Sequence, residues 1–109
     1  MSMKIVMLES AEHDLKELKN YIIKNFSVET WQNSYDKIKT SILNMKTFPD
    51  AGSIPEEFEK LSSSQYRQVV SGMNRIIYEV RLDTDYIHII TDTRRDLKSL
   101  LTRRLLRIV

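Results

Sequence analysis

Cysteine is absent from the 109-residue chain, which excludes disulfide bonds, thiolate metal sites and cysteine nucleophiles. A reducing cytoplasm is therefore the compartment we expect. The two histidines, His13 and His88, stand in different segments with no tight ligand spacing around them, so we expect neither a metal site nor a cofactor.

Glycine and proline are scarce, with two of each, so the chain is neither a linker nor a low-complexity segment. No apolar run approaches the roughly 18–20 residues that are needed to cross a bilayer. The short stretch Met1–Leu8 leads directly into charged sequence and does not have the pattern of a signal peptide. The length fits one domain over residues 1–109.

Arginine is missing from the first part of the chain, which carries only lysines as cations. Arginine is preferred over lysine where planar, bidentate contacts with phosphate or carboxylate are made. This one-sided distribution indicates a C-terminal part that meets an anionic partner, with an ordinary solvated face as the alternative. The arginines are Arg67, Arg75, Arg81, Arg94, Arg95, Arg103, Arg104 and Arg107.

Hydrophobic spacing divides the chain into strands and helices. Apolar residues at three- and four-residue intervals predict two amphipathic helices, the first with Ser10 as its N-cap. Short β-branched runs separated by polar turns predict an antiparallel meander further on. The expected elements are a strand at Met3–Leu8, helices from Ser10 to about Asn25 and from about Ser27 or Thr30 to Phe48, strands at Gln65–Val70, Arg75–Arg81 and Tyr86–Thr93, and a helix over Asp96–Val109.

These elements predict an α+β fold in the order β-α-α-β-β-β-α. An antiparallel sheet of about four strands would carry the N-terminal helical hairpin on one face and the last helix at its edge. Trp31 and Tyr35 lie on the apolar stripe of the second helix and are interpreted as core residues. We interpret His88 as a sheet residue with a hydrogen-bonded ring and Glu56, Glu57 and Glu59 as a solvated loop.

Four motifs along the chain carry a resemblance to a known family. The first is Leu8–Ile22 (L-E-S-A-E-H-D-L-K-E-L-K-N-Y-I), which is similar to the opening of the RelE/ParE superfamily of bacterial toxins. The F-P-D-A-G of Met45–Gly52 is similar to the Pro-x-x-Gly that closes the second helix in ParE-like members. Tyr66-Arg67 with Arg75–Val80 resembles the central strands, and Thr91–Leu97 (T-D-T-R-R-D-L) resembles the strand end.

The resemblance implies the growth-inhibiting toxin of a type II toxin–antitoxin system, neutralised by a cognate antitoxin. ParE-like members are associated with inhibition of DNA gyrase, with no chemistry of their own, and this is the function we favour. RelE-like members cleave mRNA in the ribosome without a metal ion, and this endoribonuclease activity is the alternative. A third possibility is an inactive relative that only binds nucleic acid or a protein partner.

The superfamily's nuclease residues map onto this chain only in part. Arg67, Arg75 and Arg95 fall where nucleases place phosphate-contacting groups, and Tyr78 or His88 could assist. The position that often carries the basic lysine is Val69, however, and the position of the RelE tyrosine is about Leu101. Neither side chain can move a proton. Glu56 or Glu59 could replace the base, but the departure favours the ParE-like branch.

The residues that we expect to contact the target or the antitoxin are basic: Arg67, Arg75, Arg94, Arg95, Arg103 and Arg104. The antitoxin is expected to wrap around the toxin as an extended segment that carries acidic and apolar residues. Such a segment would dock against a sheet edge and the helix grooves.

Overall fold

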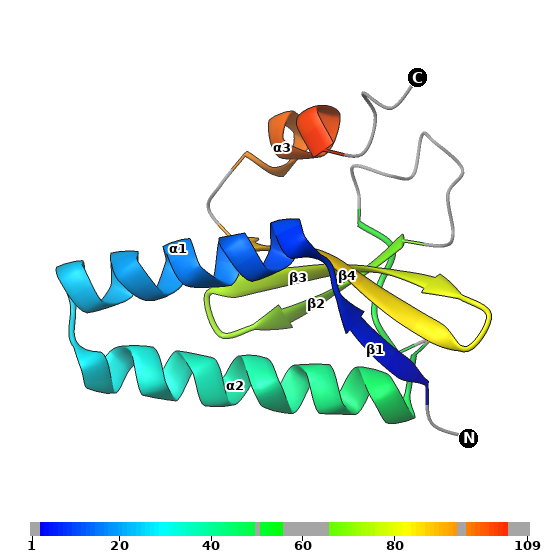
Figure 1. The fold of residues 1–109 in the computed structure, drawn as a ribbon, viewed down its shortest axis with the longest axis horizontal. Helices are drawn as coiled ribbons and strands as arrows, with labels where there is room; N and C mark the ends of the chain where they lie inside the picture. The colour runs from blue at the N-terminus through cyan, green and yellow to red at the C-terminus, as the bar shows by residue number, and fades with distance from the viewer. Residues whose placement is uncertain (1–2, 50, 56–65, 94–95, 105–109) are drawn as a thin grey trace.

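The structure is a computed structural model that describes residues 3–49, 51–55, 66–93 and 96–104. Three helices and one four-stranded sheet are present among these residues (Figure 1). In chain order the elements are β1 (Lys4–Met7), α1 (Glu9–Asn25), α2 (Val28–Thr47), β2 (Tyr66–Ser71), β3 (Asn74–Arg81), β4 (Thr84–Asp92) and α3 (Leu97–Arg104). The predicted order of elements is confirmed.

The sheet has the strand order β1-β4-β3-β2. The predicted antiparallel meander is confirmed for β2, β3 and β4, whereas β1 lies parallel to β4. The sheet is therefore mixed and not wholly antiparallel. The connection through the two helices between β1 and β2 brings the chain back to the end of the sheet at which β1 began. This long connection is compatible with β1 running parallel to β4.

The two long helices begin differently. The predicted start of α2 near Ser27 is confirmed, and Ser27 is its N-cap, since its Oγ accepts a hydrogen bond of 3.0 Å from the Thr30 backbone N–H. The prediction of Ser10 as the cap of α1 is wrong. Leu8 occupies the N-cap position without a side-chain hydrogen bond. Ser10 lies within the helix, and its hydroxyl donates to the carbonyl of His88 across 3.3 Å.

One face of the sheet packs against the hairpin of α1 and α2. Its central residues are fully buried or nearly so, and partly buried side chains from both helices pack around them. This burial of branched apolar side chains is the main source of stability in such a domain. The buried members are Ala11, Ile38, Met45, Ile76, Tyr78, Ile87 and Ile90. Trp31 is buried as predicted, but Tyr35 is exposed on the surface of α2.

The opposite face of the sheet carries α3. Leu100 packs there against Ile77 and Ile89, with Tyr66 beside them. Figure 1 shows α3 on the side of the sheet away from α2. The expected packing of the last helix at the sheet edge is thus replaced by a second, smaller apolar cluster. The predicted extension of this helix to Val109 lies outside the described residues.

The two hairpin turns depend on left-handed backbone positions. Gly72 has φ +61° between β2 and β3, where a side chain would be strained. Between β3 and β4, Leu82 takes φ +47° and is fully exposed. This turn begins one residue earlier than the predicted Asp83–Asp85 turn, so β4 already starts at Thr84.

Among the described helices, none combines the length and apolar character that a membrane span requires.

Candidate protein-binding surfaces

A β-bulge in the middle of β4 decides which way His88 points. Ile77 pairs with Ile89 and Tyr78 with Ile87, so His88 is the extra residue between two aligned pairs. Simple alternation along the strand had placed His88 on the same face as Ile90. Because of the bulge, the His88 side chain lies instead on the opposite face, beside Glu79. The predicted hydrogen-bonded ring is confirmed, because His88 Nε2 lies 2.9 Å from Glu79 Oε1.

Glu79 is the centre of a small polar cluster on the α3 side of the sheet. Its carboxylate is only 3% exposed and also accepts a 2.6 Å hydrogen bond from Arg81 Nε. This bond raises the pKa of the Arg81 guanidinium above its usual value. Tyr66 packs edge-on against the His88 ring, and its pKa is raised, first by burial and then by the Glu79 charge. Arg81 is thus engaged with a local acid.

Arg67 and Tyr78 lie on the hairpin side of the sheet, where they hold the segment after α2. They are cross-strand partners in β2 and β3 and so share a face. Arg67 Nη1 donates to the Gly52 carbonyl at 3.0 Å, and the fully buried Tyr78 hydroxyl donates to the Pro49 carbonyl at 2.8 Å. A Cβ on Gly52 would overlap the Tyr78 hydroxyl, which explains a glycine at this position.

Arg75 points to the other face of the sheet. It precedes Ile76, which belongs to the hairpin core, and successive side chains of a strand alternate. Its guanidinium donates to Gln68 Oε1 at 2.9 Å. The structure therefore separates Arg67 from Arg75 by the thickness of the sheet, although sequence reasoning had placed both around one phosphate.

The remaining predicted contact residues are distributed as follows. Arg103 is exposed on α3, and Arg104 is engaged with Asp14 of α1. Arg94 and Arg95 lie outside the described residues, as do Glu56 and Glu59. The described arginines are thus divided between the two faces of the sheet, and two of them, Arg81 and Arg104, are paired with acidic side chains.

Asp14 and Arg104 make an ion pair that sequence reasoning missed. Asp14 is 3% exposed at its side chain and Arg104 is 22% exposed. Arg104 Nη1 lies 2.6 Å from Asp14 Oδ2, which also accepts the Ile90 backbone N–H at 3.1 Å. The hydrogen bond to Asp14 raises the pKa of Arg104. A signal existed: Asp14 lies on the apolar stripe of α1 between Ala11 and Leu18, where a carboxylate requires a partner.

A groove between α1 and α2 combines apolar and cationic side chains. It encloses about 630 Å³ beside Trp31 and Tyr35, whose rings stack with centroids 5.3 Å apart. Lys39 Nζ lies 4.8 Å from the centre of the Tyr35 ring. Lys16, Lys19 and one carboxylate, Glu12, line the groove from α1. The groove is suited to an amphipathic segment with acidic residues on its rim.

The ionisable side chains that do lie together in the described part of the chain are Glu79, Arg81, His88 and Tyr66 on the α3 side of the sheet. The described residues contain no group of three or more histidine or acidic side chains placed to hold a metal ion. What the geometry offers instead is a curved sheet, a helical hairpin with a lysine-lined groove and a C-terminal helix tied to α1. This arrangement defines a small α+β protein whose prominent surfaces are suited to holding other proteins.

Comparison with known proteins identifies the family. The family model described as "ParE toxin of type II toxin-antitoxin system, parDE" matches residues 5–97. The chain therefore belongs to the ParE toxin family and is a toxin of the type II toxin–antitoxin kind, within the RelE/ParE superfamily that its motifs resembled. A ParE family toxin also implies an antitoxin as its partner.

Solved structures share the fold at low sequence identity. A chain of the chromosomal ParDE toxin–antitoxin system from P. aeruginosa has a TM-score of 0.68 and 14% identity, covering 84% of this chain and 96% of its own. The free E. coli toxin RelE, with two arginines replaced by alanine, has a TM-score of 0.65 and 11% identity, covering 100% of both chains. Among curated proteins, no relative matches the chain.

Proposed function

We propose that the protein inhibits DNA gyrase through protein contacts, without catalysing a reaction, and that it acts in the cytoplasm. The observation that carries the proposal is the position of the nuclease candidates. Arg67 and Arg75 point to opposite faces of the sheet, and Tyr78 is buried in the hairpin core. In-line attack on a phosphate needs a base and cations around the same atoms. The family model adds independent support for the ParE branch.

The expected contact with the target involves the arginines after the turn into β3. Arg75 and Arg103 are candidates on described elements, and Arg94 and Arg95 remain predictions from the sequence. Guanidinium groups favour carboxylate partners in protein interfaces, and interface energy is concentrated in few such residues. We expect the double substitution Arg75→Ala with Arg95→Ala to relieve toxicity while leaving the fold intact.

Two assays with the purified protein separate the functions. The first measures supercoiling of relaxed plasmid by DNA gyrase, and the second maps message ends after translation on ribosomes. We expect loss of supercoiling and intact message. Cleaved message with unaffected supercoiling would instead establish the endoribonuclease. A salt-dependent shift of nucleic acid with neither effect would favour the inactive, binding-only relative.

A matched pair of variants tests the arginines. Arg75→Ala with Arg95→Ala is compared with Lys24→Ala with Lys46→Ala, which removes the same charge from exposed helix ends. Only the arginine variant should lose inhibition of supercoiling. Retained inhibition, with an unchanged circular dichroism spectrum, would show that these arginines do not contact the target.

The antitoxin is proposed to dock in the groove between α1 and α2. Tyr35 is exposed there, and three lysines line the groove against one carboxylate, Glu12, which matches a segment with acidic and apolar residues. Charge reversal by Lys16→Glu with Lys19→Glu should weaken binding of the cognate antitoxin by about tenfold or more, since rim charges act on association. The control Lys24→Glu with Lys46→Glu should leave capture unchanged. Equal effects in both variants would locate the antitoxin elsewhere.

A further inference from the structure

The end of the sheet at the β2–β3 turn carries a row of polar side chains beneath the helical hairpin. Ser71 pairs with Asn74 and Asn74 pairs with Asp92, so these three side chains share one face. It is the hairpin face, because Ile76 and Ile90, each two residues away on the same strands, belong to the hairpin core. Ser71 and Asn74 are each 5% exposed. Neighbouring strands lie about 4.8 Å apart, so the row extends about 10 Å from β2 to β4.

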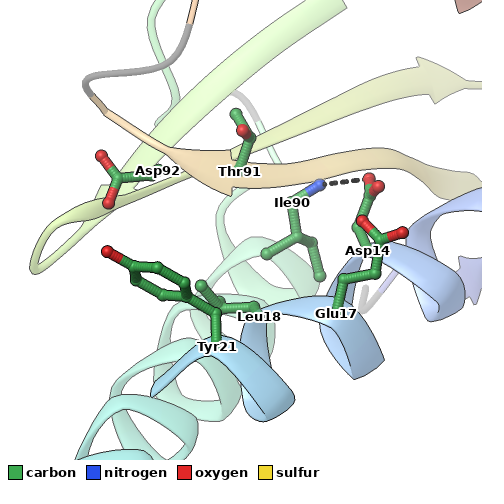
Figure 2. A pocket seen from close by; sticks show the side chains of 7 residues that line it. All are labelled: Asp14, Glu17, Leu18, Tyr21, Ile90, Thr91 and Asp92. Carbon is green, nitrogen blue, oxygen red and sulfur yellow. Dashed lines mark hydrogen bonds between the residues drawn. The ribbon is translucent and has the colours of Figure 1, made fainter. Parts of the chain in front are cut away.

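A pocket of about 280 Å³ lies between this row, the second half of α1 and the first half of α2. Figure 2 shows Leu18 and Tyr21 reaching from α1 toward the end of β4, where Asp92 lies, beside a neighbouring groove of about 470 Å³. Several large apolar side chains around the pocket are exposed, and such clusters on a surface often mark a binding site. The apolar residues of this hairpin-end pocket are Leu18, Tyr21, Ile22, Phe26 and Met73.

The Ser71 hydroxyl is buried on the polar side of the hairpin-end pocket and has no hydrogen-bond partner among the described residues. Buried hydroxyls normally have a partner, so an unpaired one indicates a place where a ligand atom can bind. Ser71 also lines a hollow on the other side of Lys37, and its side chain turns between staggered positions, so the hydroxyl can face into the pocket. The Asn74 amide adds two N–H donors in the same row.

Lys37 supplies a cation at the β2 end of the hairpin-end pocket. Its Cδ would lie 3.7 Å from a Cβ on Gly72, so the stem of the side chain runs across the turn. In the part of the chain that the structure describes, Lys37 makes no ion pair, since the adjacent Asp36 pairs with Lys39 at 3.6 Å. Asp92 is the other charged residue of the lining, but it lies at the β4 end and takes part in an interaction of its own. The pocket therefore has a cationic end and an apolar wall.

We propose that the hairpin-end pocket binds a small aromatic carboxylate, which accepts hydrogen bonds from Lys37, Ser71 and Asn74 while its ring packs along the α1 wall. Ammonium, hydroxyl and amide groups all donate, and a carboxylate is the ligand group that only accepts. The carboxylate lies at the β2 end, because the charge of Asp92 would repel it at the other end. At about 30 Å³ for each water-sized group, 280 Å³ holds about nine non-hydrogen atoms, which matches a phenyl ring with a short acid chain.

The test is a titration of the full ¹⁵N-labelled chain with 3-phenylpropionate. We expect saturable shifts at the amides of Ser71, Gly72 and Asn74, in the low millimolar range that is ordinary for a ligand of about eleven non-hydrogen atoms. The uncharged 3-phenylpropanol and the cationic 3-phenylpropylamine should bind about fivefold more weakly or less. Equal binding of the three probes would overturn the proposal. Shifts centred on the lysines of the groove between α1 and α2, or no saturation within the solubility of the acid, would overturn it as well.

A pair of lysine variants locates the cation. Lys37→Gln should weaken binding of 3-phenylpropionate about fivefold and leave binding of 3-phenylpropanol unchanged, because only the acid has a charge to pair with the ammonium. Lys46→Gln removes the same charge from an exposed position at the other end of α2 and should not weaken binding. Equal weakening by both variants would show attraction to overall charge only, which contradicts the site.

Ser71→Ala separates a ligand-binding hydroxyl from a structural one. The hydroxyl has no partner in the described fold, so its removal should leave the urea midpoint unchanged or raise it. Binding of 3-phenylpropionate should weaken about threefold, through loss of one donor to the carboxylate. A lowered midpoint with unchanged binding would show that the hydroxyl serves only the fold. These measurements involve neither gyrase nor ribosomes, so their outcome is independent of the toxin's target.

Discussion

Replacing Arg104 with alanine removes the cation that holds α3 to α1. The variant leaves the Asp14 carboxylate, 3% exposed, with the Ile90 N–H at 3.1 Å as a remaining hydrogen-bond donor. Breaking a fully buried ion pair costs about 3–5 kcal/mol, whereas an exposed pair is worth about 0–1 kcal/mol. Because Arg104 is 22% exposed, we expect an intermediate loss of about 2 kcal/mol in the free energy of unfolding.

Urea denaturation followed by circular dichroism measures this loss. With a slope of about 1–3 kcal/mol per molar urea for a small domain, the midpoint should fall by about 1 M. Arg103→Ala is the matched control, since Arg103 is exposed on the same helix and its loss should change stability by less than about 0.5 kcal/mol.

A double-mutant cycle with Asp14→Asn isolates the pair. The losses in the free energy of unfolding of the two single variants should together exceed the loss of the double variant by about 1–2 kcal/mol. The reason is that the two residues share one interaction. Additive losses in the free energy of unfolding would refute the conclusion that the Arg104 ion pair stabilises the packing of α3 against α1. An Arg104→Ala urea midpoint equal to that of Arg103→Ala would refute it as well.

Two further predictions concern the sheet. Gly52→Ala should lower stability by about 1–3 kcal/mol in thermal or urea unfolding, because the new Cβ overlaps the buried Tyr78 hydroxyl, whereas Gly72→Asn should be tolerated at its left-handed φ. Equal stability of Gly52→Ala and the parent would contradict the close approach. The raised pKa of Tyr66 means that the folded state favours the neutral phenol, so its contribution to stability is complete below the ordinary value of 10.0 and is lost as the pH rises through the higher folded value. Tyr66→Phe should therefore reduce the loss of stability above about pH 10, and an unchanged alkaline profile would argue against it.

Local patterns in the sequence were sufficient to predict where the two long helices lie. The stripe through Ala11, Leu15, Leu18 and Ile22 predicted α1. The apolar stripe of the second helix and the Phe48-Pro49 stop predicted α2 to within a few residues. Such signals depend on a helix period, a cap and a proline, which act within a few residues of chain. The Ser10 cap failed because its hydroxyl is used by a carbonyl 78 residues away in sequence.

Side-chain direction on the strands required the register. Sequence alternation alone puts His88 on the face of Ile90, but one bulge residue reverses this and brings His88 to Glu79. In the same way, Arg67 and Arg75 look equivalent in sequence, and only the pairing of β2 with β3 sends them to opposite faces. A bulge or a register shift costs little locally and is decided by packing on both faces.

The sequence by itself determined the order of elements, the apolar faces and the motifs of the ParE toxin family, because these depend on spacing along the chain. The tertiary structure decided that β1 runs parallel to β4, that Asp14 meets Arg104 and that a groove lies between α1 and the last three residues of β4. Contacts of this kind join residues up to 90 positions apart, and their energies depend on burial and on charge partners that no local pattern specifies.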